Sequence, residues 1–99
     1  MKAIIELITR RRRQILVHSV IYYRLNTNII SDHTYDAWSE ELVKLQRDYP
    51  QESEQAPFAN AYREFDGSTG AFLPIHEPNI IAKAVQLIDY HKRKGGRII

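Results

Sequence analysis

Tyrosine and aspartate side chains gather in one short stretch of the sequence. Tyr22 and Tyr23 come first, and a polar turn separates them from Asp32, Tyr35 and Asp36. Because Asp32 and Asp36 are four positions apart, a helix would point both carboxylates to one side, next to Tyr35. A corner between two helices would bring the tyrosine pair towards these acids. Aromatic faces can stack a planar cationic ring and carboxylates can bind ribose hydroxyls, so the chemistry that fits is that of a nicotinamide nucleotide.

The same residues also have a purely structural interpretation. Tyr22 and Tyr35 could pack in a core, and Asp32 could be an ordinary first-turn acid that the helix dipole favours. Aromatic residues at helical spacing are usually packed, so spacing alone favours this interpretation over a binding site.

Three further residues are weaker candidates for the same site. His18 lies one turn before Tyr22 and could line the same groove, although a packed or surface histidine is the more common state. Arg24, and with less support Arg63, could supply the positive charge that a nucleotide phosphate requires.

The first element expected to position these residues is a long helix. The stretch from Lys2 to about Leu25 contains neither Gly nor Pro and has apolar residues at helical spacing. The arginines Arg10 to Arg13 interrupt the apolar stripe for one turn. Charge runs are usually solvated, so we expect this turn to face solvent; an acidic partner protein is one alternative, and a nucleic-acid backbone is another that we do not favour.

A second helix is expected to begin at Ser31. Asn26-Thr27-Asn28 favours a turn, and Ser31 followed by Asp32 is typical of a helix start. Apolar residues then recur at alternating spacings of three and four, which predicts one buried face before Pro50 stops the helix. These residues are Tyr35, Trp38, Leu42, Leu45 and Tyr49.

The remainder of the chain predicts a loop and a third helix. Residues 51–77 are mostly polar and contain Pro57, Gly67 and Gly70, which favours an ordered loop with at most one short helical turn. Pro78 then opens a helix that ends near Gly95. We therefore predict an all-α fold in one domain, 1–99: a helical hairpin (15–50), a loop (51–77) and a C-terminal helix (78–95).

Composition limits the classes of function. A chain of 99 residues makes one small domain, so a site would be a surface groove or would be completed by a second subunit, which keeps a homo-oligomer open. The net charge of +2 does not demand a polyanionic partner. Without cysteine, and with four histidines that lack paired spacing, no metal site is expected. We find no signal-peptide or membrane-spanning run, and expect a soluble cytoplasmic protein without a membrane partner.

The run from Ile15 to Pro50 resembles the N-terminal helical domain, domain Ia, of bacterial NAD-dependent DNA ligases. The resemblance has no gap and is carried by Tyr22-Tyr23, Leu25, Ile30-Ser31-Asp32, Tyr35-Asp36, Glu41-Leu42, Leu45 and Tyr49-Pro50. In that family the domain captures the nicotinamide mononucleotide (NMN) half of NAD during ligase adenylation. The resemblance implies that this chain binds the same group through Tyr22, Tyr23, Asp32, Tyr35 and Asp36.

The chain also departs from the ligase pattern. The lysine-x-aspartate-glycine motif that accepts AMP does not occur, because Phe65-Asp66-Gly67-Ser68 lacks the lysine. Thr34 replaces an acid that would complete a capping box at the start of the second helix. After Pro50 the resemblance ends. We therefore expect a protein that binds a nucleotide and is not an enzyme.

Three functional hypotheses follow. The leading one is non-catalytic binding of NAD, NMN or an ADP-ribose-type nucleotide, for example by a phage counter-defence protein that sequesters an NAD-derived signal. The second is a protein–protein interaction module, or an accessory factor of DNA ligation or replication, that docks through Arg10 to Arg13 and residues 51–71. The third is hydrolysis of an NAD derivative, with Asp32 and Asp36 as a pair of carboxylates.

Overall fold

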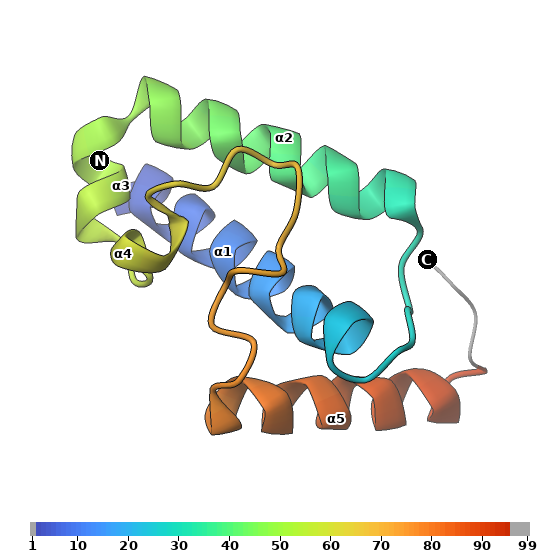
Figure 1. The fold of residues 1–99 in the computed structure, drawn as a ribbon. Coiled ribbons are helices and arrows are strands. Elements are labelled where there is room, and N and C mark those ends of the chain that lie inside the picture. The colour runs from blue at the N-terminus through green and yellow to red at the C-terminus, as the bar shows by residue number, and fades with distance from the viewer. Residues whose placement is uncertain (1, 96–99) are drawn as a thin grey trace.

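The computed structural model describes residues 2–95, which form five α-helices and no β-strand. The helices are α1 (Lys2–Tyr23), α2 (Asp32–Asp48), α3 (Pro50–Gln55), α4 (Ala59–Tyr62) and α5 (Pro78–Arg93). Helix α1 lies in the middle, with α2 packed on one side and α5 on the other (Figure 1). The connection from α4 to α5 passes over α1 in this view. The predicted all-α class is confirmed.

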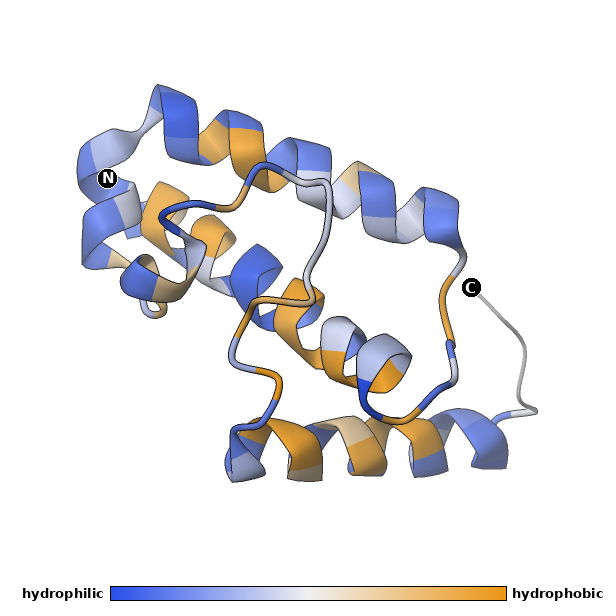
Figure 2. Cartoon of the chain, in the orientation of Figure 1, coloured by the Kyte–Doolittle hydropathy of each residue, from blue (hydrophilic) through white to orange (hydrophobic). Residues whose placement is uncertain are grey.

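Helix α1 contributes more buried residues than any other helix because it is covered on both sides. Ile8, Ile15, Leu16 and Val20 are fully buried, whereas α2 and α5 each bury only a narrow face. Figure 2 shows the same asymmetry, since α2 and the C-terminal end of α5 are largely hydrophilic. The core therefore fixes the position of α1 and leaves the ends of the outer helices available to solvent.

The predicted bounds of the first two helices, Lys2 to about Leu25 and Ser31 to Pro50, are close to those of α1 and α2. After α1 ends, Asn26 adopts a left-handed conformation with φ of 53°, which asparagine tolerates better than most residues. Ser31 caps α2, and its Oγ accepts a hydrogen bond from the Thr34 amide at 3.1 Å. The sequence signals for a turn and a helix start are therefore both confirmed.

Residues 51–77 contain more helix than predicted. Pro50 does not simply stop α2, because it is also the first residue of α3, where proline loses no helical hydrogen bond. A second short helix, α4, follows after Phe58, which has a φ of 69°. Tyr62 at the end of α4 is fully buried, so burial of a single large side chain stabilises a helix too short to form alone.

The expectation that the arginine run faces solvent is wrong at Arg12, which is only 1% exposed. Its guanidinium group donates to Gln46 Oε1 at 3.0 Å, to the Ala56 and Pro57 carbonyls at 3.2 and 3.0 Å, and to Ser53 Oγ at 2.6 Å. The planar fork of donors suits the carbonyls that the end of α3 leaves open. Arg12 therefore holds α3 and the following turn against α1.

The other arginines of the run differ from Arg12. Arg11 pairs with Glu41 of α2 at 3.2 Å, while Arg10 and Arg13 are exposed. Two of the four arginine side chains therefore interact within the protein. The hypotheses of partner docking and nucleic-acid binding assumed a continuous basic surface, of which only the other two side chains remain exposed.

Candidate functional site

A pocket of about 260 Å³ lies where the end of α1, the turn after it and the start of α2 meet. All five residues predicted to contact a nucleotide line it: Tyr22, Tyr23, Asp32, Tyr35 and Asp36. His18 lines it as well. The helical hairpin thus brings together side chains that lie up to eighteen positions apart in the sequence.

The two adjacent tyrosines form an open aromatic wall. Tyr22 is 54% exposed and Tyr23 is 38% exposed, so Tyr22 is not the core residue that the structural interpretation requires, whereas Tyr35 is half-buried and does pack against the core. Their ring centroids are 4.9 Å apart and the ring planes meet at 76°, an edge-to-face pair. Because the edge of one ring packs on the other, the pair still offers an aromatic face on which a flat ligand can stack.

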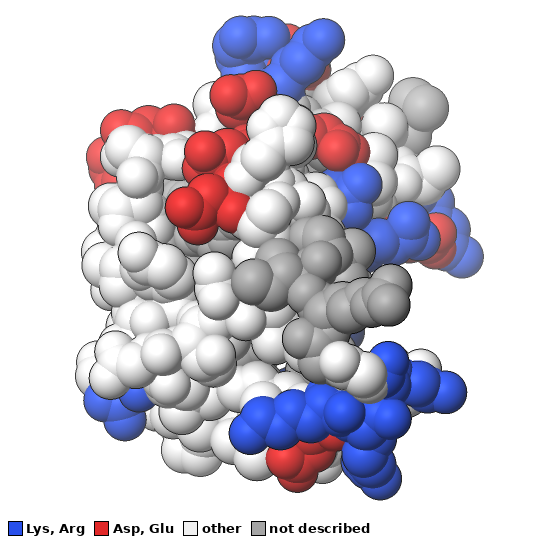
Figure 3. Space-filling model, turned by 90° about the vertical axis from the view of Figure 1, so that its right-hand side faces the viewer, with Lys and Arg blue, Asp and Glu red and all other residues white. Residues whose placement is uncertain are grey.

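Another part of the pocket wall, the acidic wall, is formed by two carboxylates. Asp32 and Asp36 are exposed at the start of α2, and no Lys or Arg is among the residues that line the pocket. Figure 3 shows the corresponding face, on which acidic side chains gather in the upper part, while basic ones lie at the top, at the right-hand edge and along the lower edge, where α5 ends. The pocket therefore favours a cationic group over a phosphate.

Tyr35 also lines the pocket and is held in place by α1. Its hydroxyl forms a hydrogen bond of 2.8 Å with Ser19 Oγ. Burial raises the pKa of Tyr35, so the phenol stays neutral near pH 7. Its role in the pocket is consequently to provide a fixed, uncharged surface.

His18 forms the floor of the pocket. It is 9% exposed, and desolvation lowers its pKa to about 4, so the ring is neutral near pH 7. The ring lies 5.3 Å from that of Trp38. Within residues 2–95 its buried Nδ1 atom has no hydrogen-bond partner. Most buried polar atoms in proteins have such a partner.

Ser68 is a lining residue that the sequence did not identify. It comes from the segment after α4, and its amide and hydroxyl groups both donate to Asp66 Oδ1, at 2.9 and 2.6 Å. The neighbouring Thr69 forms a hydrogen bond of 2.9 Å with the hydroxyl of Tyr23. Asp66-Gly67-Ser68 is recognisable as a turn, but nothing in the sequence indicates which surface that turn covers.

Arg24 and Arg63, the proposed sources of positive charge, do not line the pocket. Arg63 instead pairs with Glu54 at 2.9 Å and donates to Asn60 Oδ1 at 3.0 Å, on the α3 and α4 side of the molecule. In residues 2–95 no group of three or more His, Asp or Glu side chains could hold a metal ion. No helix in this part of the chain is long and apolar enough to cross a membrane.

The hairpin and its pocket define a small α-helical binding domain whose site suits a cationic aromatic ligand. Residues 1–56 match the family model described as the DNA ligase-like, N-terminal NAD+-binding domain. The match covers more than half of the chain, so the chain belongs to this family. It includes all five predicted contact residues and extends the resemblance expected for residues 15–50.

Individual relatives point the same way. The DNA ligases of Thermotoga petrophila, Thermotoga maritima and Thermotoga neapolitana are each 40% identical to this chain over 50 residues. That segment is 50% of this chain but only 7% of each ligase. No solved structure matches the chain. The family therefore accounts for the hairpin, whereas α4, the segment with Ser68 and α5 lie outside the matched residues.

Proposed function

We propose that this protein binds the nicotinamide nucleoside part of NAD or NMN in the pocket between α1 and α2, without chemical turnover. The observation that carries the proposal is the composition of the pocket. Within the family-matched residues, an open tyrosine pair and two carboxylates line the same pocket, and no Lys or Arg lies among the lining residues.

Each wall has a distinct role in this proposal. The face of Tyr22 or Tyr23 stacks on the positively charged pyridinium ring, which both the ring quadrupole and the acidic wall attract. Asp32 and Asp36 accept hydrogen bonds from ribose hydroxyls. The neutral ring of His18 adds an uncharged surface to the lining of the pocket beside the ligand.

The absence of turnover rests on the sequence. The lysine motif on which a ligase forms its adenylate does not occur in these 99 residues, which supports binding without adenylate formation on this chain. A protein of this kind would sequester, sense or deliver its nucleotide, and sequestration of an NAD-derived signal by a phage is the most specific form of the proposal. Incubation with NAD and assay of released nicotinamide tests this point, because release above the uncatalysed rate would establish a hydrolase.

Calorimetry with NMN and ADP-ribose tests the binding site directly. We expect NMN to bind more tightly than ADP-ribose, which has no pyridinium cation to interact with the acidic wall. Asp36→Asn should weaken NMN binding by about tenfold or more, the usual value of a hydrogen bond to a charged group, and leave unfolding unchanged because the side chain is exposed.

Asp89→Asn is the matched control. This residue is an exposed aspartate on α5, outside the pocket, and its substitution should leave NMN affinity unchanged. Failure of the wild-type protein to bind NMN, or equal affinity for NMN and ADP-ribose, would contradict the proposal.

A further inference from the structure

The pocket accommodates only part of a dinucleotide. Its volume of about 260 Å³ is below the roughly 300–1,000 Å³ that sites for whole small molecules occupy. Its two carboxylates would also repel the pyrophosphate of NAD. If the nicotinamide part binds here, as proposed above, the adenosine diphosphate part must lie elsewhere.

A second hollow, of about 440 Å³, adjoins the pocket. Ser68 lines both hollows, so the two lie on either side of this residue. The second hollow runs along α2 and includes two cations, Lys44 and Arg47, together with the carboxylates of Glu40 and Asp66. It lies between α2 and the segment after α4.

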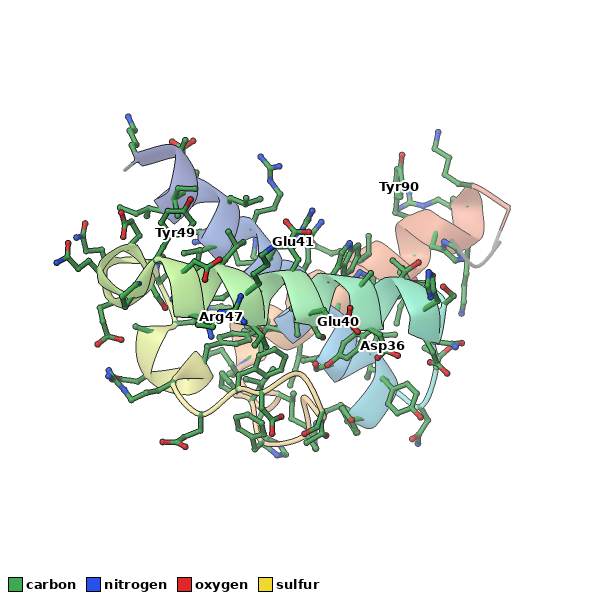
Figure 4. All side chains as sticks on the ribbon, turned by 90° about the horizontal axis from the view of Figure 1, so that it is seen from above. Asp36, Glu40, Glu41, Arg47, Tyr49 and Tyr90 are labelled. Atoms are coloured by element: carbon green, nitrogen blue, oxygen red, sulfur yellow. The ribbon has the colours of Figure 1, made fainter. Side chains whose placement is uncertain are left out.

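The two hollows follow one side of α2. Asp32, Asp36, Glu40 and Lys44 are separated by four positions each, and Arg47 comes one turn later, so the side chains form a stripe. Figure 4 shows Asp36, Glu40 and Arg47 along the same edge of α2, with Glu41 on the other. The charge of the stripe changes from acidic at its start to basic at its end.

NAD has the complementary order of charges, with a cationic pyridinium ring at one end and an anionic pyrophosphate further along. We propose that NAD lies along α2 from the first pocket across Ser68 into the second hollow, where Lys44 and Arg47 bind its phosphates. The rise of a helix separates the backbones of Asp36 and Lys44 by about 12 Å, which a nucleoside, its phosphate and a lysine side chain can bridge. The carboxylates of Glu40 and Asp66 keep the phosphates at the basic end.

Both cations are available for a ligand. Among the described residues, Lys44 has no ion pair, and Arg47 pairs only with its neighbour Asp48 at 3.1 Å. The side chains of Arg47 and Asp48 are 68% and 43% exposed, so their pair contributes little and can be exchanged for a phosphate.

A third hollow beside the first pocket is a poorer route for the phosphates. It is lined by Tyr22, Asn26, Thr27 and Asn28 and contains no charged side chain. Phosphates placed there would gain no ion pair, whereas the hollow along α2 offers two.

Calorimetry with two ligands tests the path. Nicotinamide riboside carries the pyridinium and the ribose but no phosphate, so it should reach only the first pocket. We expect the double variant Lys44→Ala/Arg47→Ala to weaken NAD binding by about fivefold, since exposed ion pairs contribute modestly, and to leave nicotinamide riboside binding unchanged. Wild-type protein should also bind NAD more tightly than nicotinamide riboside.

The double variant Lys83→Ala/Arg93→Ala is the matched control, because it removes the same two residue types from the exposed surface of α5. Its affinity for NAD should equal that of the wild type. Unchanged NAD affinity in Lys44→Ala/Arg47→Ala, or an equal loss for nicotinamide riboside, would overturn the proposed path while leaving the first pocket in place. If wild-type protein binds neither ligand, the proposed function itself fails.

Discussion

Two polar clusters lie at different points along α1. The groups of one bond within the protein, whereas those of the other are exposed in a pocket. Around Arg12, every hydrogen bond described runs to another part of the same chain, and the side chain is 1% exposed. At the other end of α1, the tyrosine pair and the carboxylates of Asp32 and Asp36 face an open pocket. The hydrogen bonds of Arg12 stabilise the fold, whereas the exposed tyrosines and carboxylates remain available to bind a ligand.

Removal of Arg12 should therefore have the largest effect on folding. Arg12→Ala leaves the carbonyls of Ala56 and Pro57 and the hydroxyl of Ser53 without their donor inside the molecule. We expect a loss of about 3 kcal/mol or more in the free energy of unfolding, measured by urea denaturation. The protein that remains folded should bind NMN with wild-type affinity, because Arg12 does not line the pocket.

Arg13→Ala is the control for this prediction. Arg13 is exposed, so its loss should change the free energy of unfolding by no more than about 0.5 kcal/mol. Equal destabilisation by the two substitutions would mean that the contacts of Arg12 contribute nothing beyond helix formation.

His18 offers a test by pH, because it belongs to the pocket yet is buried like the Arg12 cluster. Its pKa is about 4 in the folded protein, against an ordinary value of 6.5. Between these values the unfolded chain binds a proton that the folded chain does not, so stability falls as the pH is lowered from about 6.5 to 4. The full shift corresponds to roughly 3 kcal/mol, which urea denaturation at a series of pH values would measure.

His18→Gln separates this effect from the titration of other groups. Glutamine has no proton to gain in this range, so the part of the pH dependence due to His18 should disappear. Trp38 is the only tryptophan in the chain and lies against His18, and its fluorescence reports locally on the same transition. An identical pH profile in wild type and variant would show that His18 titrates normally in the folded state.

The pocket residues were predicted correctly to lie together, whereas the burial of Arg12 was not predicted, and this difference shows what helical spacing can predict. Spacing located both helices of the hairpin and brought Tyr22 and Asp36 to one corner, because a helix fixes which side chains share a face. Spacing also places Arg12 on the same face as Ile8 and Ile15, but the charge run favoured exposure instead. The segment that buries Arg12 contains Pro57 and has no helical period, so its path across α1 could not be predicted.

The same limit applies to the pocket. The five predicted contact residues follow from local spacing together with the ligase resemblance, but Ser68 reaches the pocket from a segment that lies outside the family match. Such a contact depends on tertiary packing. The basic end of α2 was missed for a related reason, because Lys44 and Arg47 look like ordinary surface residues until the Gly67 turn is placed beside them.

Gly70→Ala should have the smallest of the three effects on stability, and it tests how closely this later segment supports the pocket. A Cβ atom at this position would overlap Ser19 Oγ and the hydroxyl of Tyr35, two atoms that are hydrogen-bonded to each other. We expect Gly70→Ala to cost about 1–3 kcal/mol, the usual range for overpacking, by urea denaturation. NMN affinity should also fall, because Tyr35 is displaced.

A double-mutant cycle isolates the overlap from any general effect of alanine. In the background Ser19→Ala/Tyr35→Phe both nearest atoms are absent, so adding Gly70→Ala should cost much less there than in the wild type. An undiminished cost would place the strain elsewhere in the segment. A reduced cost would tie the segment after α4, which lies outside the residues that match the family, directly to the position of Tyr35 in the pocket.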